Sequence, residues 1–169
     1  MHHTAYEELA QFAKTLPTNA PLQIGDVGAY DVNGCLRPLF QNPTWTYRGL
    51  DLSPGPNVDI VLPSETNWNN IENGAFDVIV TVSTLEHTRR PWLVIQEIAR
   101  ILRSGGTACI CAPFAWNFHE FPIDCWRIYP DGMRAMFADA GLKEQRIYMR
   151  EFPGAPPDRG DTIAIATKP

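Results

Sequence analysis

Residues 22–34 (LQIGDVGAYDVNG) form an apolar, strand-like run followed by a turn that contains Gly28. The acid Asp26 lies at the end of the run, and about 25 residues later a second strand-like stretch ends on the acid Asp51. Strand, glycine turn, crossover, strand and acid is the order of a nucleotide-binding βαβ unit, in which the second carboxylate accepts hydrogen bonds from ribose hydroxyls. The sequence therefore predicts a parallel sheet with a nucleotide site at the carboxyl ends of its strands.

The length of 169 residues suits one domain, expected over residues 1–169 with an N-terminal helix in 1–17 and a core in 22–169. A composition of 44% hydrophobic and 20% charged residues is that of a folded protein. The net charge of −5 argues against a nucleic-acid partner. No apolar run reaches the roughly 20 residues of a membrane span, and the N-terminus lacks a signal-peptide pattern. We therefore expect no membrane partner and a cytoplasmic location.

The apolar periodicity along the chain alternates between helix and strand. Helices are expected over residues 4–16, 91–103 and 130–141, with at most two helical turns in 34–40. Strands are expected over residues 22–27, 45–52, 58–62, 76–82, 107–112, 141–152 and 161–169, with a Pro- and Gly-rich loop, 152–160, joining the last two. The strand at 76–82 is apolar on both faces, which indicates a parallel sheet covered by helices on both sides. Gly105 and Gly106 are expected to end the helix that starts at Pro91.

Two longer stretches carry the most specific signal. They are FDVIVTVSTLEH, residues 76–87, and PWLVIQEIARILRSGGTACICAP, residues 91–113. Together with the order of elements over residues 22–167, they resemble the small-molecule-type branch of the class I S-adenosylmethionine-dependent methyltransferases. The resemblance implies an α/β fold: a Rossmann-like doubly wound sheet of about seven strands, mostly parallel, with a C-terminal antiparallel hairpin and helices on both faces.

The same resemblance implies S-adenosylmethionine as the cofactor and assigns roles to seven residues. Asp26 and Gly28 belong to the first motif, beside the methionine part. Asp51 is expected to bind the ribose hydroxyls and Leu52 to lie against the adenine. Thr81 and Val82 are expected near the methionine moiety. At the seventh position, Tyr30, the family usually has a glycine.

The first motif departs from the pattern of the family, which usually reads acid-x-Gly-x-Gly-x-Gly. Here Tyr30 takes the place of the second glycine and Gly34 comes late, so the turn must be longer or differently shaped. Tyr30 either fills the space that a glycine leaves or contacts the cofactor. We expect a Cβ on Gly28 to occupy space that the cofactor needs, without harm to the fold.

The segment 119–127 (HEFPIDCWR) follows the fifth expected strand, where ligands bind in open α/β sheets. His119 is the candidate general base, because histidine titrates near neutral pH. The candidate substrate-side residues are Glu120, Asp124, Trp126 and Arg127. The alternative is a well-hydrogen-bonded loop in which Asp124 and Arg127 form a salt bridge and no residue touches a substrate.

Other polar residues are expected to be structural. The resemblance makes Glu86 and His87 mainly structural, and helical spacing makes Glu97 and Arg100 a solvated ion pair. Of the four cysteines, those at 109 and 111 are expected to pack in the core. A zinc site combining them with His119 and Cys125 is the alternative, but the spacing is not that of a metal finger. No metal is expected.

These observations predict a methyltransferase that moves the methyl group of S-adenosylmethionine to a small-molecule or sugar-like acceptor by in-line displacement. The main alternative is a catalytically inactive methyltransferase-like protein that binds the cofactor or another nucleotide. An NAD-dependent dehydrogenase is disfavoured because G-x-G-x-x-G is absent. An RNA methyltransferase is disfavoured because no basic stripe is present. The sequence predicts neither the acceptor atom nor the oligomeric state.

Overall fold

Seven strands form a single sheet in the order β3-β2-β1-β4-β5-β7-β6 in the computed structural model, which describes residues 2–154 and 159–169. The strands are β1 (Leu22–Val27), β2 (Trp45–Asp51), β3 (Ile60–Val61), β4 (Phe76–Val82), β5 (Leu102–Ala115), β6 (Lys143–Glu151) and β7 (Gly160–Thr167). The helices are α1 (His3–Lys14), α2 (Pro91–Ile101) and α3 (Pro130–Asp139), with short 3-10 helices η1 (Arg37–Phe40) and η2 (Leu85–His87).

The sheet is parallel from β3 through β5 and antiparallel at its other end. β7 pairs antiparallel with β5, and β6 pairs antiparallel with β7. The fold class is therefore confirmed, including the C-terminal hairpin. Residues 155–158 of the predicted loop between the last two strands lie outside the described residues.

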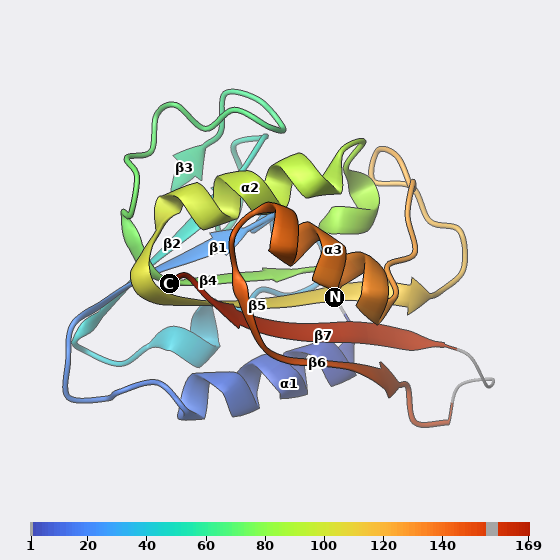
Figure 1. Ribbon diagram of the computed structural model, residues 1–169, viewed down its shortest axis with the longest axis horizontal. Coiled ribbons are helices and arrows are strands. Elements are labelled where there is room, and N and C mark those ends of the chain that lie inside the picture. The colour runs from blue at the N-terminus through green and yellow to red at the C-terminus, as the bar shows by residue number, and fades with distance from the viewer. Residues whose placement is uncertain (1, 155–158) are drawn as a thin grey trace.

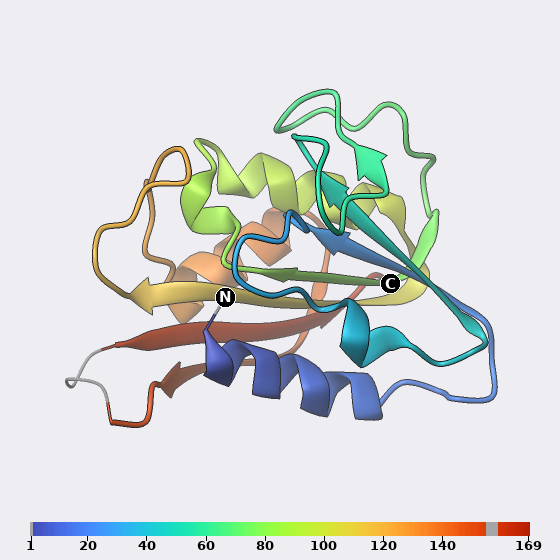
Figure 2. The same ribbon diagram turned by 180° about the vertical axis from the view of Figure 1, so that it is seen from behind.

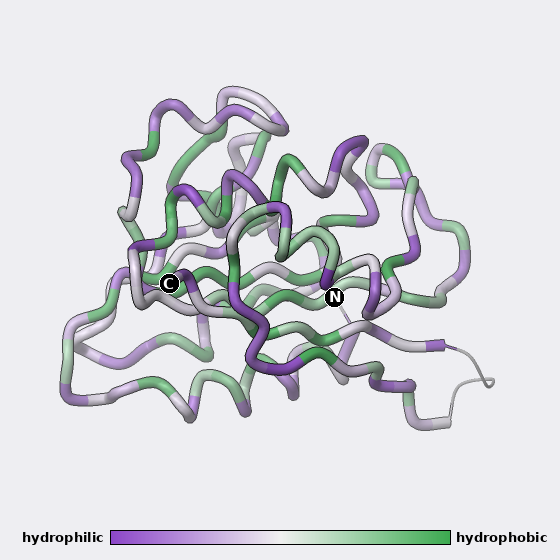
Figure 3. Tube along the Cα trace, viewed as in Figure 1, coloured by the Kyte–Doolittle hydropathy of each residue, from purple (hydrophilic) through white to green (hydrophobic). Residues whose placement is uncertain are grey.

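Helices cover both faces of the sheet, as the apolar central strands require. Figure 1 shows α2 and α3 on one face, and Figure 2 shows α1 and η1 on the other. One core packs α2 and α3 against side chains such as Ile79 and Ile110, and the second packs α1 against Val78, Val80 and their neighbours. The alternation of successive β4 residues between the two cores follows from the two-residue period of a strand. The edge strand β6 is largely hydrophilic (Figure 3).

Several predicted boundaries are wrong. Helix α2 ends at Ile101 because Leu102 is extended, fully buried and paired with Phe76 in the sheet. Gly105, at φ +76°, therefore lies in an irregular stretch inside β5 and does not end the helix. β5 is also longer than predicted at both ends. β3 is reduced to two residues. Among the described residues, no helix is long and apolar enough to cross a membrane.

The predicted ion pair of Glu97 with Arg100 is confirmed, at 2.8 Å, but it is not simply solvated. Glu97 also accepts the backbone N–H of Trp68, and Arg100 donates to the carbonyls of Trp68 and Ile71. The pair therefore fixes the connection that leads into β4. The strand order of the sheet reverses direction between β1 and β4. In open α/β sheets such a switch point is where ligands bind.

Candidate functional site

A cavity of about 700 Å³ lies at the carboxyl ends of the parallel strands. Its walls come from the turns after β1, β2 and β4 and from the segment after β5. A volume of this size is typical of a site for a cofactor or small molecule. Eight residues predicted as functional line it: Asp26, Gly28, Tyr30, Asp51, Leu52, Val82, His119 and Glu120.

Asp51 connects the two turns that carry the nucleotide-binding pattern. Its Oδ2 accepts the backbone N–H of Tyr30 at 3.1 Å, and its Oδ1 accepts that of Ser53 at 3.1 Å. Each carboxylate oxygen has further acceptor capacity. Asp51 is only partly buried and faces the cavity, so a ligand hydroxyl can reach it.

The turn after β1 is folded onto β2 and the loop that follows it. Gly28 and Ala29 both donate their N–H groups to the carbonyl of Leu50, and Asp31 donates to that of Pro56. With the Tyr30 amide bound to Asp51, the four successive amides of residues 28–31 have partners within the chain. The ring of Tyr30 packs against Gly55, where no side chain would fit.

Gly28 is required by the chain itself, so the expected reason for this glycine is wrong. Its φ of +78° is in the left-handed region that favours glycine. A Cβ there would lie under 3.0 Å from three side-chain atoms of Thr84, rather than in open space. Thr84 Oγ1 in turn donates to the carbonyl of Val27 at 3.2 Å, which joins the end of β1 to the turn after β4.

Asp26 is buried beneath the turn and accepts a hydrogen bond from the hydroxyl of Tyr47 on β2. Burial raises the pKa of Asp26 to about 7, while the Tyr47 hydrogen bond and the charge of Arg37 act in the opposite direction. Asn57 donates to the carbonyl of Ala29 at 2.9 Å and so extends this support to the turn. Asp26 lines the cavity floor, but its carboxylate is already engaged.

Two predicted residues that follow each other on β4 lie on opposite sides of the sheet. Val82 lines the cavity. Thr81 does not, because its side chain is fully buried and its hydroxyl has no hydrogen-bond partner among the described residues. Direct contact of Thr81 with a ligand in this cavity is therefore not supported.

The segment after β5 is the well-hydrogen-bonded loop that the alternative interpretation describes. The Asp124 carboxylate accepts two bonds from Arg127, at 2.6 and 2.7 Å, and the backbone N–H of His119 at 2.8 Å. The Arg127 guanidinium holds the pKa of Asp124 well below its usual range. Trp126 donates its ring N–H to the carbonyl of Thr88 at 2.8 Å. Asp124, Trp126 and Arg127 do not line the cavity; they hold His119, which does.

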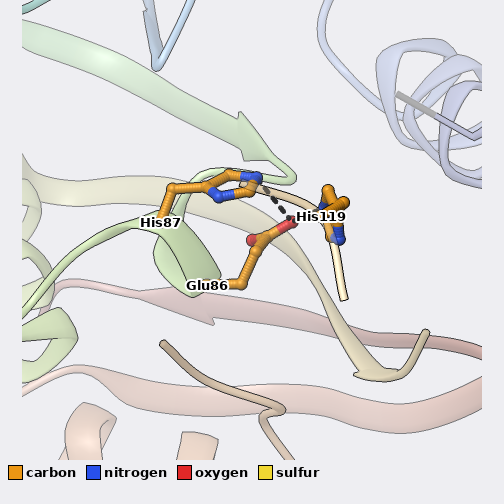
Figure 4. A group of neighbouring side chains, drawn as sticks. All are labelled: Glu86, His87 and His119. Atoms are coloured by element: carbon orange, nitrogen blue, oxygen red, sulfur yellow. Dashed lines mark ion pairs between the residues drawn. The ribbon is translucent and has the colours of Figure 1, made fainter. Parts of the chain in front are cut away.

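Glu86 and His87, from η2, meet His119 at the end of the cavity (Figure 4). The Oε1 atom of Glu86 lies 3.8 Å from His87 Nε2 and 4.0 Å from His119 Nε2. Burial raises the pKa of Glu86 to about 8, and the nearby carboxylates of Asp161 and Asp124 add to the effect. Burial also lowers the pKa of His87, and the adjacent His119 does the same. We refer to Glu86, His87 and His119 as the Glu-His-His cluster.

Sequence reasoning missed several residues around the cavity. His2 packs its ring on Trp116 and Phe152, at centroid distances of 4.3 and 4.4 Å, and lines the cavity. Tyr47 supports Asp26. The S-T-L-E-H motif contained Glu86 and His87, but nothing local indicated that His119 would join them. Cys109 and Cys111 are buried as predicted, whereas Cys125 is exposed, so the cysteine-based zinc site is not formed.

A sequence model of the methyltransferase domain matches residues 33–110. A curated relative from Oryza sativa subsp. japonica, named 2-methyl-6-phytyl-1,4-hydroquinone methyltransferase 2, chloroplastic, is 28% identical over 104 residues. The alignment covers 59% of this chain and 27% of the relative, so the match spans about a quarter of that protein's length.

The fold is shared with a solved methyltransferase over nearly the whole chain. The 1,6-didemethyltoxoflavin-N1-methyltransferase of Burkholderia thailandensis, solved with S-adenosylhomocysteine bound, has a TM-score of 0.74 and 14% identity, and the match covers 97% of this chain and 78% of that one. Residues 33–110 are therefore similar to a methyltransferase domain, and nearly the whole chain shares the fold of a solved methyltransferase. The domain match and the shared fold confirm the predicted resemblance to the class I S-adenosylmethionine-dependent methyltransferases and support S-adenosylmethionine as the cofactor.

The methyltransferase fold also carries other named activities. The 4+2 cyclase SpnF has a TM-score of 0.72 and 16% identity to this chain, and the match covers 96% of this chain and 81% of that one. The shared fold alone therefore does not identify the reaction, which depends on the residues that line the cavity.

Proposed function

We propose that the protein transfers the methyl group of S-adenosylmethionine to a small-molecule acceptor. The observation that carries this proposal is one cavity that both Asp51 and His119 line. A cofactor anchored at Asp51 and an acceptor placed near His119 share the same space, as direct transfer between them requires.

In the proposed binding mode, Asp51 accepts hydrogen bonds from the ribose hydroxyls and Leu52, half exposed at the rim, lies against the adenine. The methionine part extends along the ends of β1 and β4, past Gly28 and Val82. Since the amides of residues 28–31 already have partners, side chains and carbonyl groups make the cofactor contacts here. Asp26 lies beneath the turn after β1 and is proposed to affect cofactor binding only by stabilising that turn.

The sulfonium of the cofactor makes its methyl group electrophilic, so the protein mainly has to align the acceptor and remove its proton. The acceptor atom forms the new bond to the methyl carbon, the carbon–sulfur bond breaks, and S-adenosylhomocysteine leaves. In a metal-free site, Nε2 of His119 is the atom that would take the acceptor's proton. Asp124, Trp126 and Arg127 are positioning residues that fix the loop bearing this histidine.

The acceptor is proposed to have a planar or apolar body. Tyr30, Trp116 and Phe121 line the cavity, and Phe121 is about half exposed at its edge. Aromatic walls bind flat apolar ligands with little need for polar partners. The acceptors named for the rice relative and the Burkholderia enzyme, a hydroquinone and a toxoflavin precursor, are ring compounds of this kind.

Two measurements test the proposal. Calorimetry should detect binding of S-adenosylhomocysteine. NAD, the cofactor of the disfavoured dehydrogenase interpretation, should not bind. Turnover is then followed as S-adenosylhomocysteine formed from S-adenosylmethionine with a panel of phenols, hydroquinones and heteroaromatic amines. Cofactor binding without turnover on the panel would favour the alternative, a non-catalytic cofactor-binding protein. Two observations motivate this alternative: the first motif departs from the family pattern, and a cyclase shares this fold. No cofactor binding would contradict both.

A further inference from the structure

Three ligand atoms of the Glu-His-His cluster lie within 4.8 Å of one another at the end of the cavity. Figure 4 shows the carboxylate of Glu86 between the two imidazole rings. The rings are nearly perpendicular, at 85°, with centroids 4.8 Å apart. Because His87 and His119 both line the cavity, a small ion can reach this point from it.

The hydrogen bonds on the far side of each ring set which nitrogen faces Glu86 as an electron-pair donor. His87 Nδ1 lies 2.6 Å from the carbonyl oxygen of Ile123, and His119 Nδ1 lies 3.0 Å from that of Asn117. A carbonyl oxygen only accepts, so each Nδ1 carries the hydrogen and each neutral ring has its lone pair on Nε2. Such anchoring of the second ring nitrogen is typical of metal-binding histidines.

Glu86 supplies the second, independent observation. Its side chain is 1% exposed, and neither carboxylate oxygen has a hydrogen-bond partner among the described residues. The distances of 3.8 and 4.0 Å to the two Nε2 atoms are too long for N–H···O bonds, which measure about 2.7–3.2 Å. Three acceptor atoms therefore converge with nothing between them. Buried carboxylates are normally paired or coordinate a metal.

The surrounding charges favour a cation. The carboxylates of Asp161 and Asp124 and the guanidinium of Arg127 interact electrostatically with Glu86. Arg127 is engaged by Asp124 through two hydrogen bonds. The imidazole Nδ1 of His2 lies 3.7 Å from the Oδ2 atom of Asp161. Neither Glu86 nor Asp161 has an arginine or lysine partner in the part of the chain that the structure describes.

We propose that Glu86, His87 and His119 bind one divalent first-row transition-metal ion through Oε1, Nε2 and Nε2. Two imidazoles and one carboxylate are a donor set that suits Zn²⁺, Co²⁺ or Fe²⁺, whereas Mg²⁺ prefers oxygen ligands. Ligands 2.0–2.2 Å from a tetrahedral ion lie about 3.4 Å apart, so each histidine has to approach Glu86 by about half an ångström. The two histidine nitrogens, which lie within 4.8 Å of each other, have to close by up to about 1.4 Å. His119, with 34% of its side chain exposed, has the freedom to move.

The ion would keep open positions toward the cavity. If the proposed methyl transfer holds, the acceptor's oxygen or nitrogen is the ligand that fills one of them, and its proton leaves to solvent from the metal-bound atom. His119 then acts as a ligand instead of a base. The metal site itself does not depend on that reaction, because it can be measured without cofactor or acceptor.

The test is metal binding by the full chain after treatment with a chelator. Zn²⁺ uptake is measured by calorimetry, and Co²⁺ uptake by its visible absorption bands, with Mg²⁺ as the comparison ion. We expect one ion per chain, with Zn²⁺ and Co²⁺ bound far more tightly than Mg²⁺. Glu86→Gln keeps the volume of the side chain, and His119→Ala alters a partly exposed residue. Each should weaken Zn²⁺ binding ~10²-fold or more, since losing even an outer partner of a metal ligand costs about 10–100-fold.

The matched control is His3→Ala, which removes a histidine whose side chain is 85% exposed near the N-terminus. It should leave Zn²⁺ affinity and stoichiometry unchanged, and Zn²⁺ should raise the Tm of this variant and of the wild type but not of His119→Ala. Absence of Zn²⁺ and Co²⁺ uptake by the wild type would overturn the proposal. So would equal affinity in His119→Ala, or a loss of binding in His3→Ala.

Discussion

Thr84 occupies the space that a side chain on Gly28 would need, although Gly28 follows β1 and Thr84 follows β4. The close approach of these two residues brings the turns after β1 and β4 together over the cavity floor. Because Gly28 also has a φ of +78°, both its conformation and its surroundings exclude a Cβ. Gly28 therefore affects the site through the backbone conformation that it allows, which lets the two turns approach each other.

We expect Gly28→Ala to destabilise the fold itself. The left-handed conformation costs a non-glycine residue about 1–2 kcal/mol, and overpacking against Thr84 adds about 1–3 kcal/mol. Urea denaturation measures the loss. Adding Thr84→Ala should recover the overpacking part, so the two changes should be non-additive in a double-mutant cycle. Gly132→Ala, where nothing lies within 4 Å, should instead leave stability equal or slightly higher. An unaltered urea midpoint for Gly28→Ala would contradict the proposed contact.

Asp51→Asn should weaken S-adenosylhomocysteine binding by about ten- to a hundredfold, because charge-assisted hydrogen bonds contribute about 1.5–3 kcal/mol. Asparagine keeps the size of the side chain and one acceptor for the amides of Tyr30 and Ser53, so the turn should persist. Calorimetry is the measurement. The control is Asp59→Asn, an acid in the same loop that pairs with Arg37 and does not line the cavity. Equal affinity in both variants would remove Asp51 from the ribose site.

Asp26 should make stability depend on pH. Its pKa is 3.8 when unperturbed and about 7 in the fold, so between these values the folded state holds a proton that the unfolded state has lost. Unfolding free energy should therefore fall as pH rises from about 4 to about 7 and level off above that. At about 1.4 kcal/mol per pKa unit, the buried carboxylate accounts for a few kcal/mol.

The contribution of Asp26 is isolated by comparing Asp26→Asn with the wild type at each pH. The variant lacks the titrating group, so its stability relative to the wild type should rise between pH 5 and pH 8. Denaturant unfolding at several pH values checks this. Asp139→Asn, on the exposed face of α3, should show no such trend. A relative stability of Asp26→Asn that stays flat with pH would mean that Asp26 is ionised in the fold throughout.

Local patterns were sufficient to predict most of the sheet. The β-branched run of β4 and the alternation of helix and strand placed the strands within a few residues, because burial on both faces demands apolar runs. The end of α2 was missed because Leu102 leaves the helix to pair with Phe76, a long-range contact. The glycine signal at Gly105 and Gly106 pointed to a real turn but assigned it to the wrong element.

The site was predictable where residues follow strand ends and unpredictable where loops meet. Asp51 and His119 were found from their positions after strands. The support of Asp26 by Tyr47 and the meeting of Glu86 with His119 depend on how distant segments pack. The segment after β5 was recognised, but only the structure separates His119, on the cavity, from Asp124 and its partners behind it. The cytoplasmic location stays a prediction, and the sequence predicted no oligomeric state.

Arg127→Lys should lower turnover roughly 10- to 100-fold while leaving cofactor affinity unchanged. Lysine cannot reproduce the two parallel bonds to Asp124, so the loop that carries His119 loses its fixed position, and small misplacements of reacting groups have effects of this size. Steady-state kinetics should show the loss in kcat more than in the KM for S-adenosylmethionine. Arg134→Lys, which alters a comparable arginine paired with Asp131 and Glu144 on the surface, is the control. A similar loss in both variants would indicate a general effect of the substitution.

His119→Ala should reduce turnover by about 10²–10⁴-fold with S-adenosylmethionine affinity near that of the wild type, since loss of proton removal acts on the chemical step. Chelator treatment of the wild type separates the two ways in which His119 can contribute. If Nε2 is the base, the treated enzyme keeps its activity and His119→Ala stays impaired. If Nε2 is a metal ligand, the treated wild type becomes as slow as the variant, and Zn²⁺ or Co²⁺ restores the wild type alone. Full activity of His119→Ala would exclude both roles, whereas a joint loss of cofactor affinity and thermal stability would make His119 a structural residue of the loop.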